Sequence, residues 1–224
     1  MGIKKQILLT SVILLLTILL FGLTNIDVYI QDMFYNFHNK NWILDKNLQP
    51  WKFIFYDGLK RLLISIAVIL LLVLVLFRKN KTIKLYKKGL LLIVLCSIFI
   101  PFIIIGLKNN TNMPCPKNEI SYGGQMPRTA VWEKYEKPYK SMKHISCWPA
   151  GHASGGFVLL SFFFLFSTKR NKMLALFIAL GVGWSMGIYK MLIGDHYLSH
   201  TIITMILSWI CILGMHTLIF KEQD

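Results

Sequence analysis

Long apolar runs alternate with short polar segments along the whole chain. Each run is long enough, or nearly so, for a membrane-crossing helix, which needs roughly 20 residues to span a hydrocarbon core of about 30 Å. None is long enough to be divided into two helices. The pattern predicts an all-α, polytopic membrane protein of one domain, residues 1–224, with six transmembrane helices. The expected spans are 7–24, 60–77, 89–107, 153–168, 173–189 and 199–219.

The composition and the first residues agree with this interpretation. Hydrophobic residues make up 55% of the 224 residues, more than is usual in a soluble domain. The N-terminal segment has the charged and then apolar layout of a signal peptide, but its apolar part is long and no small-x-small cleavage site ends it. We expect it to remain as an uncleaved first helix.

The placement of the charges indicates a topology. The formal net charge is +15, which would fit a nucleic-acid partner, but Lys and Arg are densest in short segments between the apolar runs. The positive-inside rule assigns such segments to the cytoplasm. We therefore expect no nucleic-acid partner, cytoplasmic termini, and external loops at 25–59, 108–152 and 190–198.

The external loops carry aromatic residues and two of the four cysteines. Tyr, Trp and Phe mixed with charges in the first loop predict short interfacial helices. Cys115 and Cys147 both lie in the second loop, in an oxidising compartment, so we expect a disulfide between them. Cys96 and Cys211 fall within apolar runs and are interpreted as packing residues.

The segment "PAGH" (149–152) lies where the fourth apolar run begins. A helix start presents free N–H groups and a positive dipole end, which favour an anion such as phosphate. Gly151 would let the backbone approach an oxyanion closely. The segment therefore predicts a phosphate-binding turn with His152 as an acid–base group; the alternative is an N-capping turn with an interfacial histidine.

A second histidine cluster opens the last apolar run. The i, i+4 spacing of His196 and His200 predicts that both lie on one face of a helix, where one imidazole could react and the other orient it. The same spacing is common in zinc sites, but the H-E-x-x-H form fails because residue 197 is Tyr. Lys108 and Lys190, at the same membrane border, are expected to clamp an anion, although lysines there can also simply snorkel.

These residues resemble the type 2 phosphatidic acid phosphatase family, whose motifs are K-x6-R-P, P-S-G-H and S-R-x5-H-x3-D. Here the first reads "KNNTNMPCP" (108–116), the second "PAGH" (149–152) and the third "YKMLIGDHYLSH" (189–200). All three occur in order, with the family's spacing, at the predicted membrane border.

Four motif positions depart from the family pattern. The family's Arg is Cys115 here and its Ser is Ala150; its Ser-Arg pair is Tyr189-Lys190 and its final Asp is His200. One phosphate-binding arginine is thus replaced by lysine and the other is lost. Arg128 or a loop lysine is a candidate for the missing cation. Asp195 would point about 100° away from His196 on a helix, so we do not expect it to replace the lost aspartate.

The resemblance implies a metal-independent lipid phosphatase without a cofactor. His196 would form a phosphohistidine, His152 would act as acid and base, and His200 would orient His196; Lys108, Lys190 and the amides at Gly151 would hold the phosphoryl oxygens.

The implied setting is the bacterial inner membrane, with a site facing the periplasm or exterior and a monomeric enzyme in contact with membrane lipids. The candidate substrates are lipid A, undecaprenyl pyrophosphate and phosphatidylglycerophosphate, and the basic external loop favours lipid A. A phosphotransferase with the same site, a degenerate inactive member, and a non-catalytic lipid-binding or transport protein are the alternatives.

Overall fold

The computed structural model describes residues 2–139 and 145–220, and within these residues the chain is largely helical. Five of the described helices are long and apolar enough to cross a membrane. The chain is therefore an all-α, polytopic membrane protein. The helices are α1 (Ile3–Leu23), α2 (Ile26–Asp32), α3 (Leu59–Leu76), α4 (Lys81–Asn109), α5 (Gly151–Phe157), α6 (Lys169–Leu192) and α7 (Leu198–Ile219).

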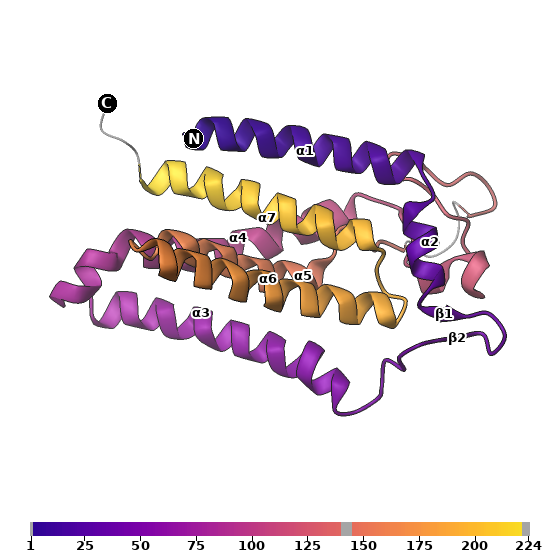
Figure 1. Cartoon of the computed structure of the whole chain (residues 1–224), viewed down its shortest axis with the longest axis horizontal. Helices are drawn as coiled ribbons and strands as arrows, with labels where there is room; N and C mark the ends of the chain where they lie inside the picture. The colour runs from indigo at the N-terminus through magenta and orange to yellow at the C-terminus, as the bar shows by residue number, and fades with distance from the viewer. Residues whose placement is uncertain (1, 140–144, 221–224) are drawn as a thin grey trace.

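The long helices lie side by side, with both termini at one end of the bundle and α2 at the other (Figure 1). Helix α5 is central and packs against α4, α6 and α7, whereas α1 lies along α7 and α3 along α4. The two outer helices bury very few side chains within the protein, as expected for helices that face lipid. Helix α1 buries only Phe21, and α3 buries none of its residues. Their Leu, Ile and Val side chains stay exposed because hydrocarbon, not water, would surround them.

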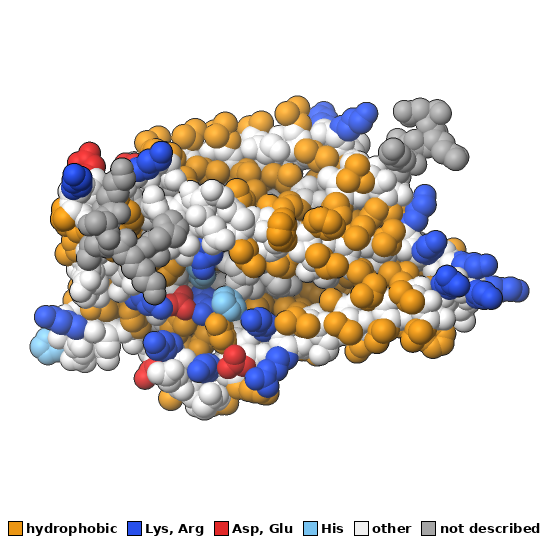
Figure 2. Space-filling model, turned by 180° about the vertical axis from the view of Figure 1, so that it is seen from behind, with side chains coloured by type: hydrophobic (Ala, Val, Ile, Leu, Met, Phe, Trp, Pro, Cys, Tyr) orange, Lys and Arg blue, Asp and Glu red, His pale blue; other side chains and the backbone are white. Residues whose placement is uncertain are grey.

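Side-chain type changes along the length of the molecule (Figure 2). Hydrophobic side chains cover the middle of the face shown, and Lys and Arg gather at the end that carries the termini. The opposite end mixes Lys and Arg with Asp, Glu and His. This contrast between the two ends is the distribution from which the topology was predicted.

The fourth expected span, 153–168, is shorter in the structure. Helix α5 continues as a 3₁₀-helix over Val158–Phe164, and Thr168 already belongs to the next element, because its side chain caps the start of α6 by accepting a hydrogen bond from Asn171 N at 3.4 Å. A 3₁₀-helix rises further per residue than an α-helix, so residues 151–164 reach about 25 Å. This apolar segment is too short to count among the five long helices.

Helix α4 begins two turns earlier than the expected span 89–107. Its first eight residues, 81–88, were expected to be a polar cytoplasmic connection. Asn80 accounts for the difference: its Oδ1 accepts hydrogen bonds from Thr82 N at 2.8 Å and Ile83 N at 3.4 Å, which satisfies two free donors at the helix start.

The segment between α1 and α3 combines helix α2 with a two-stranded antiparallel hairpin, which the hydrophobic pattern did not predict. Its strands, β1 (Tyr35–Asn36) and β2 (Asn41–Trp42), have only two residues each, too few for a recognisable alternation. A π-helical turn at Phe53–Gly58 then leads directly into α3.

In the loop that follows α4, short 3₁₀ turns cover Pro116–Asn118 and Ile120–Tyr122.

Helix α2 is fastened to α7 through Asp27. The buried carboxylate of Asp27 accepts hydrogen bonds from Ser199 N at 2.9 Å and from Ser199 Oγ at 2.5 Å. It thereby caps the first turn of α7 from another element. Burial raises the pKa of Asp27 to about 6, although the hydrogen bonds from Ser199 oppose that shift.

Candidate active site

The segments carrying Lys108 and His152 are joined by covalent and hydrogen bonds. A disulfide links Cys115 to Cys147. Beside it, Cys147 N donates to Met113 O at 3.0 Å, and Thr111 Oγ1 donates to Trp148 O at 2.9 Å. The turn before His152 is thus held against the segment that follows the C-terminal end of α4.

The turn at His152 is also tied to α7. Ala150 N donates to Thr204 Oγ1 at 2.8 Å, and this hydroxyl in turn donates to His200 O at 2.7 Å. Thr204 is fully buried, so it links the second motif to the third without contact with solvent. Together with the disulfide, this contact brings the three motif segments into one cluster.

His196 lies in the turn between α6 and α7, not on the helix that the i, i+4 spacing predicted. Helix α6 ends before Gly194, whose φ of 72° is in the left-handed region. The carbonyl of Lys190 then accepts hydrogen bonds from Asp195 N at 2.8 Å and His196 N at 3.3 Å. A side chain at Gly194 would also collide with the ring of Trp42, so glycine is required there on two grounds.

The two imidazoles meet nevertheless. Nδ1 of His196 lies 3.3 Å from Nδ1 of His200, and both rings are buried, with exposed fractions of 4% and 0%. Two ring nitrogens at this distance share one proton, with one nitrogen donating and the other accepting. Since Nδ1 of His196 is occupied in this way, Nε2 is the nitrogen left for chemistry.

The surroundings of His196 keep its imidazole neutral. Burial lowers its pKa well below the usual range, and the charges of His200, Lys108, Lys190 and His152 lower it further. These effects also show that the predicted site residues lie within electrostatic range of one another. A neutral imidazole has a free lone pair, which is the form that can attack an electrophile.

Asp195 does not act on His196 through a hydrogen bond; its carboxylate binds two lysines instead. Oδ2 accepts from Lys190 Nζ at 2.7 Å and Oδ1 from Lys117 Nζ at 2.5 Å. Burial by itself raises the pKa of Asp195, but the Lys190 ammonium and the hydrogen bonds from both lysines outweigh it, so the pKa lies below its ordinary value. Lys190 is therefore a buried cation paired with Asp195.

His152 lies in the first turn of α5, with Ala150 as the N-cap residue. Its ring stacks on Tyr56, with 4.4 Å between ring centroids, and Lys190 Nζ lies 4.1 Å from the centroid of the same tyrosine. Tyr56 belongs to the π-helical turn before α3, and its ring contacts both His152 and Lys190. A Cβ at Gly151 would meet nothing within 4 Å, so there is open space over that backbone.

An apolar groove of about 490 Å³ opens at Lys108, Gly151 and His152. It is lined by residues of α3, α4 and the helical segment 151–164, and Lys60 is among them. It runs from the polar cluster along the outer part of the bundle. Its apolar lining residues include Leu63, Ile64, Ala67, Val68, Ile98, Ile105 and Leu159.

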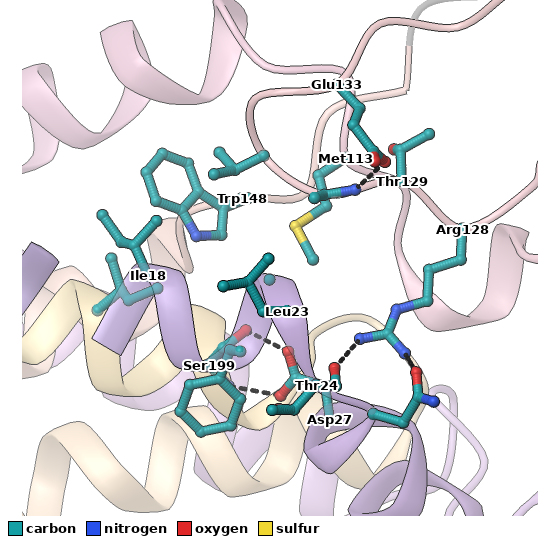
Figure 3. A pocket seen from close by; sticks show the side chains of 16 residues that line it. Ile18, Leu23, Thr24, Asp27, Met113, Arg128, Thr129, Glu133, Trp148 and Ser199 are labelled. Carbon is teal, nitrogen blue, oxygen red and sulfur yellow. Dashed lines mark hydrogen bonds between the residues drawn. The ribbon is translucent and has the colours of Figure 1, made fainter. Parts of the chain in front are cut away.

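Arg128 lines a different pocket, of about 230 Å³, between α1, α2 and the loop around Trp148 (Figure 3). Its guanidinium donates to Asn25 Oδ1 at 3.3 Å and Thr24 O at 3.4 Å and lies 5.7 Å from the ring centroid of Tyr197. Arg128 is thus engaged away from the groove, which argues against it as the replacement for the lost motif arginine.

Comparison with known proteins adds one decisive finding. The family model of the PAP2 superfamily matches residues 88–224, which include all three motif segments. The chain belongs to the PAP2 superfamily. Members of this superfamily are phosphatases acting on phosphate esters, so this PAP2 protein is a phosphoester hydrolase. No curated protein and no solved structure matches the chain significantly.

Two residues of this PAP2 site were missed by sequence reasoning. Tyr56 lies outside the matched region, and nothing in its spacing connects it with His152, about a hundred residues later. Lys117 directly follows the first motif, and the loss of arginine at Cys115 was the available signal for a nearby cation.

In residues 2–139 and 145–220, no group of three or more His, Cys, Asp or Glu side chains is placed to hold a metal ion.

Proposed function

We propose that this PAP2 protein removes a terminal phosphate, as a monoester or from a pyrophosphate, from a membrane lipid. The observation that carries the lipid substrate is the apolar groove at Lys108, Gly151 and His152. A water-soluble phosphate ester has no apolar part that would fill a groove of about 490 Å³ beside the phosphate site. A lipid tail would lie in the groove while its phosphate reached the histidines, and burying the tail would stabilise the complex by about 0.8 kcal/mol per CH₂.

The first chemical step is transfer of the phosphoryl group to His196. Nε2 attacks phosphorus, the bond from phosphorus to the lipid oxygen breaks, and His152 donates a proton to that leaving oxygen. His200 accepts the hydrogen bond from Nδ1 of His196, fixing the tautomer that leaves Nε2 unprotonated. Lys108, Lys190 and the backbone amide at Gly151 stabilise the charge on the transferred phosphoryl oxygens.

The second step releases inorganic phosphate. His152, now neutral, accepts a proton from water as the water oxygen attacks phosphorus, and the P–N bond to His196 breaks. His152 has then regained the proton that it gave to the leaving oxygen, and His196 is again free to attack. Imidazoles and lysines supply every role, so we expect no metal requirement.

We propose six membrane crossings, with residues 151–164 as a short fourth crossing buried among the others. Both termini then lie in the cytoplasm of the bacterial inner membrane, and the histidine cluster faces the periplasm or exterior. Support comes from the concentration of Lys and Arg at the end with the termini (Figure 2) and from the positive-inside rule. The same external end carries the basic loop that favours a multiply charged headgroup, which places lipid A ahead of the other candidate substrates.

Phosphate release from a panel of lipid phosphates by the purified protein in detergent tests this function. The panel contains lipid A, undecaprenyl pyrophosphate, phosphatidylglycerophosphate and a short-chain water-soluble phosphate ester. We expect release from at least one lipid, faster than from the soluble ester, with activity kept in the presence of a chelator and inhibited by orthovanadate. Release from the soluble ester alone would contradict the lipid assignment, and loss on chelation with recovery in zinc would contradict the metal-free mechanism.

A further inference from the structure

We propose that Lys117 is a phosphate-binding residue of this site, supplying the cation that Cys115 cannot. The inference rests on the proposed function for its substrate, but it comes from a different observation. The carboxylate of Asp195 holds the ammonium groups of Lys117 and Lys190 at once, at 2.5 and 2.7 Å. Two ammonium groups that lie close enough to bind one carboxylate are also close enough to bind two oxygens of one phosphate.

The backbone of Lys117 is fixed over the turn that carries His196. Lys117 N donates to Gly194 O at 3.0 Å, and Asn118 N donates to Cys115 O at 2.8 Å within the 3₁₀ turn. The disulfide of Cys115 fastens the same turn to the segment before His152. Lys117 thus belongs to a short, bonded piece of backbone and not to a freely moving loop.

Lys117 and Lys190 differ in exposure, and this difference assigns them different roles. The side chain of Lys117 is 40% exposed, that of Lys190 is 8% exposed, and that of Asp195 is 18% exposed. A half-exposed ion pair contributes little, so Lys117 can exchange the carboxylate for a phosphate oxygen at small cost. Lys190 has three N–H donors, so it can keep its buried pair with Asp195 and still donate to a phosphate oxygen.

Lys117 also lies within electrostatic range of Lys108 at the mouth of the groove. Lys108 is thus in electrostatic range of both Lys117 and Lys190, and the three lysines come from three elements: α4, the 3₁₀ turn that follows it, and the end of α6. The simpler alternative is that Lys117 only fastens its loop to Asp195. That role would affect stability but not the binding of an anion, so the two can be separated.

Orthovanadate, a phosphate analogue, is the probe for this test. Its affinity is measured by calorimetry on the full-length protein in detergent for the wild type and for Lys117→Ala, Lys117→Arg and Lys134→Ala. Lys134 is an exposed lysine of the same external loop and serves as the matched control. Lys117→Ala is expected to weaken binding by about 10- to 100-fold, as for loss of one hydrogen bond to a charged group. Lys117→Arg should keep most of the affinity, because the charge remains, and Lys134→Ala should match the wild type.

Kinetics with the lipid found active separates this inference from the proposed function. A lower kcat/KM for Lys117→Ala, restored by Lys117→Arg, supports the assignment. If the wild type hydrolysed no lipid phosphate but Lys117→Ala still weakened vanadate binding, the proposed function would fail and Lys117 would remain an anion-binding residue. Wild-type vanadate affinity in Lys117→Ala, whatever its melting temperature, would overturn the inference.

Discussion

Nδ1 of His196 and Nδ1 of His200 lie 3.3 Å apart, although His196 precedes the helix that carries His200. The partner of the proposed nucleophile is thus a second imidazole, where the family pattern has a carboxylate. An imidazole accepts the hydrogen bond but stabilises a developing positive charge less than an aspartate does. His200 can therefore still orient the ring of His196, but it stabilises a positive charge on that ring less than an aspartate would.

This arrangement predicts a graded response at position 200. His200→Ala should lower kcat by less than the roughly 10²–10⁴-fold expected for loss of the acid–base group in His152→Ala. His200→Asp restores the family residue and should be faster than His200→Ala. Steady-state kinetics of the three variants, each checked for folding by its elution and melting temperature, gives the order. A larger loss in His200→Ala than in His152→Ala would contradict the assigned roles.

The groove predicts a lipid-selective defect. Ala67→Phe would place a ring in the space assigned to the lipid tail. Displacing two tail methylenes costs about 1.6 kcal/mol, so kcat/KM for a lipid phosphate should fall at least about tenfold, whereas a short soluble ester should be unaffected.

Ile69→Phe is the matched control for the groove, since Ile69 is an exposed residue of α3 that does not line it. Equal losses for lipid and soluble substrates in Ala67→Phe, or a loss as large in Ile69→Phe, would count against the tail site.

The burial of Glu119 predicts that the free energy of unfolding depends on pH. Glu119 is 1% exposed, its Oε1 has no hydrogen-bond partner among the described residues, and burial raises its pKa to about 7. Because the folded state binds this proton more tightly than the unfolded state, stability falls as pH rises from about 4.5 to 7. Glu119→Gln removes this dependence and should stabilise the protein above pH 7 by up to about 3 kcal/mol.

Melting temperatures at pH 5 and pH 8 check this expectation for Glu119. The gain from Glu119→Gln should be confined to the higher pH, with Glu136→Gln, an exposed acid of the same loop, as the control. A gain of equal size at both pH values would mean that the glutamine acts by packing and not by removing a charge.

The disulfide between Cys115 and Cys147 predicts two free thiols in the unreduced, denatured protein. Cys96 and Cys211 are free, so alkylation should modify two cysteines without reductant and four with it. Closing a loop of this size contributes about 3–4 kcal/mol in the chain-entropy model, and reduction should lower the melting temperature accordingly. Mass spectrometry that found four alkylated cysteines without reductant would reject the bridge.

The site could be predicted from local patterns only as far as the motifs themselves reach. The clustering of Lys108, His152 and His196 followed from apolar run lengths and charge placement, because these properties decide on which side each border lies. The helical position of His196 was wrong because the chain turns at Gly194 and α7 begins only at Leu198, and the i, i+4 spacing does not show either feature. The stacking of Tyr56 on His152 and the pairing of Lys117 with Asp195 depend on tertiary contacts across distant segments.

The most direct measurement of the central claim is a rapid acid-free quench of the enzyme with a ³²P-labelled lipid phosphate, compared between wild type, His196→Ala and His38→Ala. His38 is an exposed histidine of the hairpin and serves as the control. The wild type and His38→Ala should carry protein-bound label that is stable in alkali and lost in acid, as a phosphohistidine is. His196→Ala should carry none and release no phosphate while remaining folded. Near-normal phosphate release from His196→Ala would contradict the assigned nucleophile and the mechanism built on it.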